Sequence, residues 1–228
     1  MNQLNLYRFL GFVLFLVWAF DANGETSERG MVYEVRLAFL DAGELNFKLY
    51  FSSMEYSFRG YFETRGLVHK YYRWKGDFAA IGRLESGLPR MERYYARSES
   101  KDHSRKFVVL ADDAVRLLPP EGKDFEFKSR PKGNDLVTVF FLTPSCYKGK
   151  YVNDGEDTFG ISLLKTKEVN SKDTESASIL SCYYRVTDDK GRARKVVVTL
   201  VSSIYGFIAK EVRVKLPLLP DIVFNLRN

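Results

Sequence analysis

Apolar and polar residues alternate along most of the chain, and the pattern is clearest between residues 33 and 51. One face of this stretch is apolar and consists of Tyr33, Val35, Leu37, Phe39, Leu45, Phe47, Leu49 and Phe51. A period of two is typical of half-buried antiparallel strands, and Asp41-Ala42-Gly43 contains residues that favour a tight turn. The pattern therefore predicts a β-hairpin that turns at residues 41–43.

Similar alternation returns in most later segments, as far as Ile222, Phe224 and Leu226. We predict a mainly β protein, in which an antiparallel sheet of about ten to twelve strands curls into a barrel, spiral or half-barrel around one or two short helices. No internal repeat or change of composition marks a domain boundary, so residues 25–228 are predicted to form a single domain.

Two segments depart from the alternation. Leu67, Tyr71 and Trp74 have helical spacing, which indicates a short amphipathic helix. The segment from Asn134 to Leu142 is apolar on every side after its first two residues, both of which can cap a helix. We predict that this second segment is a buried helix that plugs the curled sheet.

Residues 1–24 have the composition of a secretory signal peptide. A short start containing Arg8 precedes a twelve-residue apolar run from Phe9 to Phe20, and small residues at Ala22 and Gly24 fit a cleavage site. An uncleaved membrane anchor is the alternative, but a bilayer span takes about 20 apolar residues. We predict cleavage after Gly24 and export to the periplasm, with no transmembrane span left in the mature chain.

Export changes the interpretation of Cys146 and Cys182, the two cysteines of the chain. In an oxidising compartment they are the one possible internal pair, and a bridge would stabilise the fold by roughly 3–4 kcal/mol on a chain-entropy model. We predict this disulfide; two buried free thiols or an intermolecular bond are the alternatives.

The formal net charge is +6, and the excess is local: residues 59–106 contain twelve Lys or Arg and six Asp or Glu. This segment is also rich in Tyr and Trp. It is interpreted either as a solvated face with ordinary strand aromatics or as a patch for phospholipid head groups, lipopolysaccharide or peptidoglycan. Nucleic acid would fit the same composition, but the export signal argues against it.

The sequence contains no recognisable catalytic or metal-binding motif. His69 and His103 are the two histidines, and neither has the spacing of a metal ligand or a catalytic base. The paired acids at residues 112–113 and 188–189 lie in predicted turns, where Asp serves the backbone. We therefore predict a protein that is not an enzyme and has no cofactor or metal; an enzyme of unrecognised type is the remaining alternative.

Short motifs are distributed over most of the mature chain. They are Tyr33-x-Val-x-Leu, Asp41-Ala-Gly43, Thr64-x-Gly66-Leu67, Tyr72-x-Trp74-x-Gly76, Gly82-x-Leu84, the segment from Pro89 to Tyr95, Arg105-Lys106, Asp135-Leu136, Cys146 ahead of Asp154-Gly155, and Cys182-x-Tyr184-Arg185. Together they resemble the exported bacterial family catalogued as domain of unknown function 3108. Relatives typically carry Asp-Pro-Leu where Leu136 directly follows Asp135 here. The resemblance implies a periplasmic β-rich fold akin to lipoprotein-carrier or spiral-barrel envelope proteins, and it implies no activity.

Two functional hypotheses follow. In the first, the protein is a non-enzymatic component of the cell envelope that binds an amphiphilic molecule or a partner protein and supports envelope integrity. Its predicted contact residues are Tyr71, Tyr72, Arg73, Trp74, Arg93 and Arg97. In the second, it is a purely structural interaction module whose interior is filled by its own aromatic side chains and the predicted helix. An outer-membrane barrel is disfavoured because the strands keep no continuous lipid-facing apolar band.

Overall fold

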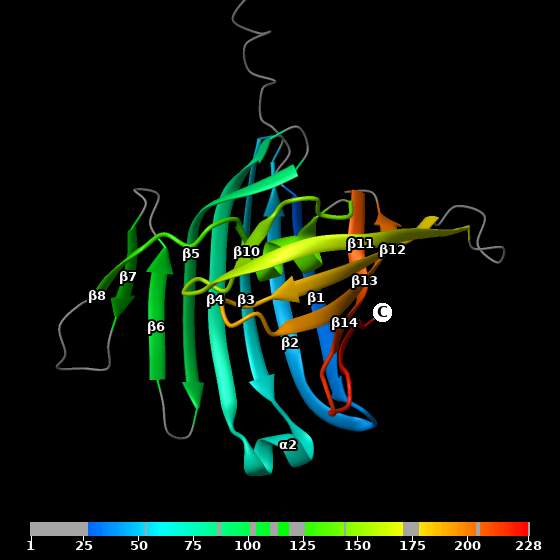
Figure 1. The fold of residues 1–228 in the computed structure, drawn as a ribbon, viewed down its shortest axis with the longest axis horizontal. Coiled ribbons are helices and arrows are strands. Elements are labelled where there is room, and N and C mark those ends of the chain that lie inside the picture. Colours follow the sequence, from blue (N-terminus) through cyan, green and yellow to red (C-terminus); the bar gives the residue numbers. More distant parts are fainter. Residues whose placement is uncertain are drawn as a thin grey trace, which may run out of the picture.

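The strands form one sheet that curls around a short buried helix (Figure 1). The computed structural model describes residues 27–52, 54–85, 88–100, 104–109, 114–118, 126–143, 145–170, 178–203 and 206–227. The predicted signal peptide, residues 1–24, and His103 lie outside the described residues.

In the described residues, fifteen strands make up the sheet, and three of them have four residues or fewer. They are β1 (Ser27–Leu37), β2 (Leu40–Phe51), β3 (Glu55–Thr64), β4 (Trp74–Glu85), β5 (Leu88–Ser100), β6 (Ser104–Val109), β7 (Ala114–Leu118), β8 (Glu126–Ser129), β9 (Asn134–Asp135), β10 (Tyr151–Asn153), β11 (Thr158–Asn170), β12 (Ser178–Thr187), β13 (Ala193–Ser203), β14 (Gly206–Lys215) and β15 (Ile222–Leu226). The helical elements of the described chain are α2 (Gly66–Tyr71) and η1 (Thr138–Leu142).

The sheet consists of two meanders that meet in its middle. The first runs from β1 to β8 and the second from β15 back to β9, and β1 pairs with β15 between them. The predicted mainly β, curled architecture around short helices is confirmed, with twelve strands longer than four residues. One pairing departs from the prediction of an antiparallel sheet, because β9 runs parallel to β10.

Side chains bring the second meander back to the first. β6 pairs with residues 94–99 of β5, and no described strand pairs with the earlier part of β5 on that side. There the Met91 N–H donates to Asn134 Oδ1 (3.0 Å), and Arg130 donates to the Met91 carbonyl oxygen (2.9 Å). Asn134 Nδ2 also donates to the Pro89 carbonyl oxygen (2.7 Å). These contacts hold the curl nearly closed without a continuous ladder of backbone hydrogen bonds.

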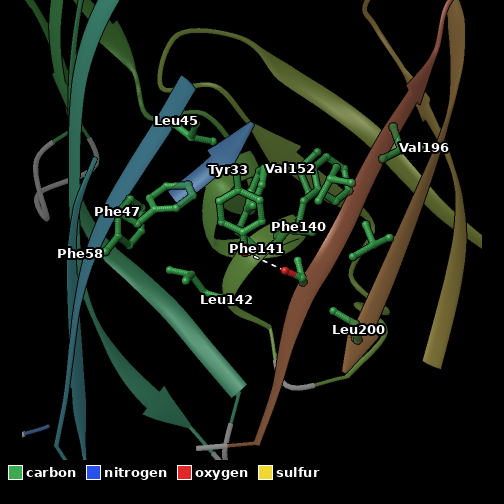
Figure 2. Close-up of a cluster of buried hydrophobic side chains, with 14 of the residues drawn as sticks. Tyr33, Leu45, Phe47, Phe58, Phe140, Phe141, Leu142, Val152, Val196 and Leu200 are labelled. Atoms are coloured by element: carbon green, nitrogen blue, oxygen red, sulfur yellow. Dashed lines mark hydrogen bonds between the residues drawn. The ribbon is translucent and has the colours of Figure 1, made fainter. Parts of the chain in front are cut away.

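The helix η1 lies inside the curl, between the wall of β1–β5 and the wall of β11–β14 (Figures 1 and 2). All five of its residues are buried, including Phe140 and Phe141. The Phe141 ring packs edge-on against Tyr33 at 5.0 Å between centroids, and the Tyr33 hydroxyl donates to the Ala209 carbonyl oxygen across the interior (2.7 Å). The predicted buried plug is therefore present, but its helix starts later than predicted, because Asn134 and Asp135 form the short strand β9.

The first hairpin turns earlier than predicted. Residues 38–39 form the turn, and Phe39 is 90% exposed instead of lying on the buried face. Val35 pairs with Gly43 and Arg36 with Asp41, so residue 42 is an extra residue in β2. Residues 41–43 thus form a β-bulge, which bends the strand and explains why turn-favouring residues occur inside it.

The predicted disulfide between Cys146 and Cys182 is confirmed. It joins the segment after η1 to β12. Beside it, the Tyr147 N–H donates to the Tyr184 hydroxyl (2.7 Å). The bridge and this hydrogen bond fix the position of the segment that follows the plug.

Candidate functional site

The interior of the curl is only partly filled. A half-enclosed cavity of about 640 Å³ lies between η1 and the end of the sheet that carries α2. Its apolar lining comes from both meanders, from α2 and from the plug: Val35, Leu37, Ala42, Leu45, Phe62, Val68, Trp74, Phe78, Ala96, Leu136, Val137, Phe141, Ile222 and Phe224. The polar residues of the lining are Thr64, Asp77, Arg97, Ser98, Asp154 and Glu156.

Small residues on the inward face of β4 and β5 leave this space. Gly76 pairs with Ser98, and Phe78 pairs with Ala96. Of these four inward-facing residues, only Phe78 has a large side chain. Further along β4, the buried Ala80 pairs with the buried Tyr94, whose ring occupies the interior. The hollow is therefore encoded by cross-strand pairing, not by a lack of apolar residues.

The plug that roofs the cavity is capped by a buried carboxylate. Asp135 accepts hydrogen bonds from the Thr138 N–H (2.8 Å) and the Thr138 hydroxyl (2.6 Å). Burial raises the pKa of Asp135 to about 6, and the Thr138 hydrogen bonds oppose that rise. Tyr56, from β3, lies 3.5 Å from the Thr138 hydroxyl oxygen, and burial together with the charge of Asp135 raises the pKa of Tyr56. This polar group positions the roof.

Thr64 holds α2 against the lower edge of the cavity. Its hydroxyl accepts a hydrogen bond from the Trp74 N–H (3.0 Å) and lies 3.0 Å from the Tyr72 carbonyl oxygen. His69 Nδ1 lies 2.9 Å from the Thr64 carbonyl oxygen, so this histidine belongs to the same backbone-fixing group. The arrangement turns Val68 and Trp74 toward the cavity.

The six predicted contact residues do not form one site. Trp74 lines the cavity and packs against Phe62 at 4.6 Å between ring centroids. Tyr71, Tyr72 and Arg73 are exposed beside it, on and just after α2. The predicted aromatic contacts are thus close to the cavity, although most of them lie outside it.

Arg93 and Arg97 occupy the other face of the sheet. Arg97 pairs with Asp77, next to the inward-facing pair of Phe78 and Ala96, so the strand alternation places Arg97 on the opposite face. Part of Arg97 still borders the cavity. Its guanidinium is bonded to Glu99, while its Nε is buried without a hydrogen-bond partner among the described residues. Arg93 is exposed and pairs with the exposed Ile81. Neither arginine is positioned as an interior contact.

Much of the basic segment is neutralised locally. Five of its cations make ion pairs with carboxylates: Arg65 with Glu44 (2.7 Å), Lys75 with Glu99 (2.8 Å), Arg83 with Glu92 (2.8 Å), Arg90 with Glu85 (2.7 Å) and Arg97 with Glu99. Among the cations of residues 59–100 that the structure describes, those without an ion pair to another described residue are Arg59, Lys70, Arg73 and Arg93. The interpretation as a solvated face accounts for most of the segment.

The sequence did not indicate the other half of the lining. Ile222 and Phe224 of β15, Leu136 and Val137 before η1, and the loop at residues 154–156 all border the cavity. The one available signal was the run of small inward residues at Gly76, Ala96 and Ser98, and its meaning depends on strand register.

Two further features of the described residues bear on chemistry. They include no group of three or more His, Cys, Asp or Glu side chains arranged to hold a metal ion. Among the same residues, no helix is both long enough and apolar enough to cross a bilayer.

Comparison with known proteins places the fold in a known architecture. A solved structure, the crystal structure of a beta-barrel-like protein of domain of unknown function DUF1849 from Brucella abortus, superposes with a TM-score of 0.52. The match covers 90% of this chain and 98% of that chain at 10% sequence identity, so it bears on the fold alone. No protein-family model and no curated protein sequence matches the chain. The resemblance to domain of unknown function 3108 stays a prediction.

Proposed function

We propose that this protein binds the hydrocarbon part of an amphiphilic molecule inside its curled sheet. The observation that carries the proposal is the cavity of about 640 Å³ beneath η1. Protein interiors are close-packed, and ligand pockets span roughly 300–1,000 Å³. An apolar hollow of this size, in a chain rich in large aromatic residues, is better explained by a ligand than by imperfect packing.

The lining indicates the chemistry of the ligand. Most of the lining is aliphatic and aromatic, and its polar members are Thr64, Asp77, Arg97, Ser98, Asp154 and Glu156. A hydrocarbon chain would be buried among the apolar residues, and a polar end would stay at the edge, where it keeps its hydration. This arrangement favours an acyl-chain amphiphile, and the N-terminal sequence pattern supports a location in the periplasm, where such molecules build the envelope.

We propose binding, not catalysis, because two of the polar groups around the cavity, Thr64 and Asp154, already serve the backbone. The Thr64 hydroxyl is engaged with the backbone of residues 72 and 74. Asp154 Oδ1 accepts the N–H groups of Glu156 and Asp157, at 3.0 and 2.8 Å. These groups hold turns in place, which suits a container for a ligand more than a site for acid–base chemistry.

Native mass spectrometry of protein purified gently from its own envelope tests the proposal directly. A bound adduct with the mass of a lipid is expected. Binding of a fluorescent fatty acid, a dansylated undecanoic acid, then measures the site. Ala96→Trp fills the cavity and should weaken binding at least about tenfold, since it removes the space for several methylene groups.

The matched control is Ala79→Trp, which adds the same side chain to β4. Residue 79 pairs with Arg59 and Tyr95 and lies between the inward-facing residues 78 and 80, so it is on the outer face of the sheet. The Ala79→Trp variant should therefore bind the probe like the wild type. A bare mass together with no probe binding, or equal binding by both variants, would reject the proposal. That outcome would favour the interaction module, and chemical cross-linking in cells would be the next experiment.

A further inference from the structure

Exposed apolar side chains gather at one end of the curled sheet. The turn at residues 38–39, the helix α2 and the turn at residues 217–219 all lie at the lower end in Figure 1, and we call them the mouth connections. Phe39 is 90% exposed, Tyr71 is 83% exposed and Leu218 is fully exposed. Leu67, Tyr72 and Leu219 are exposed on the same connections.

The mouth connections adjoin one another and the cavity. The Ala38 N–H donates to the Asp221 carbonyl oxygen (3.4 Å), and the Arg65 N–H before α2 donates to the Ala42 carbonyl oxygen (3.0 Å). The cavity is lined at this end by strand termini, among them Leu37 and Ile222. The exposed apolar residues therefore lie next to the cavity, at the end lined by Leu37, Val68 and Ile222.

Two turns present apolar residues with a strained backbone. Ala38 has a φ of 55° and Leu218 a φ of 60°, in the left-handed region that glycine adopts without penalty. Such strain often marks functional positions. If the turn had only a structural role, a residue that adopts this conformation without strain would be expected there. At position 218 a glycine would relax the turn but remove the exposed leucine.

Cations without partners accompany the apolar residues. Lys70, Arg73 and Lys215 are exposed on or beside the mouth connections, and none of them makes an ion pair in the described part of the chain. By contrast, Arg65 and Arg213 at the same end are paired with carboxylates. The apolar tips are thus flanked by unpaired positive charge.

We propose that the mouth connections dock on the surface of an anionic phospholipid bilayer, with Phe39, Leu218 and Leu219 entering the interface. Each lysine or arginine near an anionic surface adds attraction, and Tyr and Trp favour the interfacial region of a bilayer. Single apolar residues that protrude from separate turns suit penetration between lipids better than contact with a flat protein face. The proposed docking extends the proposed function. It relies on that function only for the identity of the ligand in the cavity.

Vesicle flotation tests the docking. The protein is produced with its own leader in an exporting host, and its processed form is checked by intact mass. We expect binding to vesicles of phosphatidylglycerol mixed with phosphatidylcholine, weaker binding to phosphatidylcholine alone, and a loss of binding as salt rises. The Phe39→Ser/Leu218→Gly double variant should reduce the partition coefficient about tenfold or more.

Matched controls separate docking from general effects. Ile81→Ser/Leu164→Ser removes two exposed apolar residues elsewhere on the sheet and should bind like the wild type. Ala38→Gly relaxes the first turn without removing Phe39 and should also bind. Lys70→Glu/Arg73→Glu/Lys215→Glu should abolish the preference for anionic vesicles, whereas Lys167→Glu on β11 should leave it intact.

Several outcomes would overturn the docking. They are no vesicle binding by the wild type, equal losses in the mouth and control variants, or a dimer in sedimentation that Phe39→Ser/Leu218→Gly dissolves, which would assign these residues to a second copy. The proposed function can fail separately. If both proposals hold, Ala96→Trp keeps vesicle binding and loses the soluble fatty-acid probe, whereas Phe39→Ser/Leu218→Gly does the reverse. If only the proposed function fails, the wild type binds vesicles but does not bind the probe.

Discussion

Two phenylalanines on the same face of β3 illustrate the two parts of the interior. Phe58 is completely buried, and its ring packs near those of Phe47 and Phe78, at 6.3 and 6.0 Å between centroids. Phe62, four residues further along, borders the cavity and contacts Trp74. The strand supplies equivalent side chains at both places. What differs is the surroundings: Phe58 is enclosed by other aromatic rings, whereas Phe62 borders the cavity.

The largest expected effect comes from truncating these two rings. Phe58→Ala should lower the free energy of unfolding by about 3–5 kcal/mol, because it opens a void in a packed region. Phe62→Ala should cost less than half as much, about 1–2 kcal/mol, because its ring already borders open space. Urea denaturation of both variants measures the difference. Equal losses would mean that the two parts of the interior are packed alike.

A second prediction concerns the roof. The pKa of Asp135 is raised from 3.8 to about 6 by burial, so between these values the folded protein holds a proton that the unfolded chain has released. Stability contributed by this group is therefore present at pH 4 and lost as the pH rises to 6. Asp135→Asn removes that dependence and keeps an oxygen to accept the Thr138 N–H.

Urea denaturation between pH 4 and 7 checks this expectation. The free energy of unfolding of the wild type relative to Asp135→Asn should fall by up to about 3 kcal/mol across the window. Other carboxylates contribute equally to both proteins, so the difference isolates residue 135. Parallel profiles for the two proteins would contradict a roof capped by a buried acid.

The smallest effects come from one substitution made in both parts of the interior. Ala80→Leu enlarges a side chain that is 1% exposed and opposite Tyr94, so overpacking should cost about 1–3 kcal/mol. Ala96→Leu extends into the cavity and should stabilise the ligand-free protein by about 0.5–2 kcal/mol. Thermal unfolding of delipidated protein distinguishes the two. Destabilisation by both variants would show that the cavity collapses in solution.

Patterns within single segments predicted much of the fold. Alternation at Tyr33, Val35 and Phe47 identified a buried strand face, and the apolar run ending at Leu142 identified the plug, because both signals are local. The hairpin turn was missed because Ala38 and Phe39 carry no turn signature. The glycine-like conformation is adopted by an alanine, while the turn-favouring residues 41–43 form a bulge.

The candidate site was harder to predict because it depends on register. The cavity exists since Gly76 meets Ser98 and Phe78 meets Ala96, which the sequence of either strand alone does not specify. The irregular pairing near Gly82 also shifts the phase of β5, so that Met91 and Tyr94, three residues apart, both face inward. Arg93 and Arg97 were assigned to the site without knowledge of that shift.

The pairing of β1 with β15 has a consequence for how the chain acquires its structure. Each meander can form from neighbouring strands, whose contacts are close in sequence and quick to make. Joining the meanders requires Tyr33 to meet Leu226, a contact of very high sequence separation with a corresponding entropic cost of loop closure. That joint cannot exist until residue 226 has been synthesised. Until then, the two meanders of the nascent chain stay unjoined at β1 and β15.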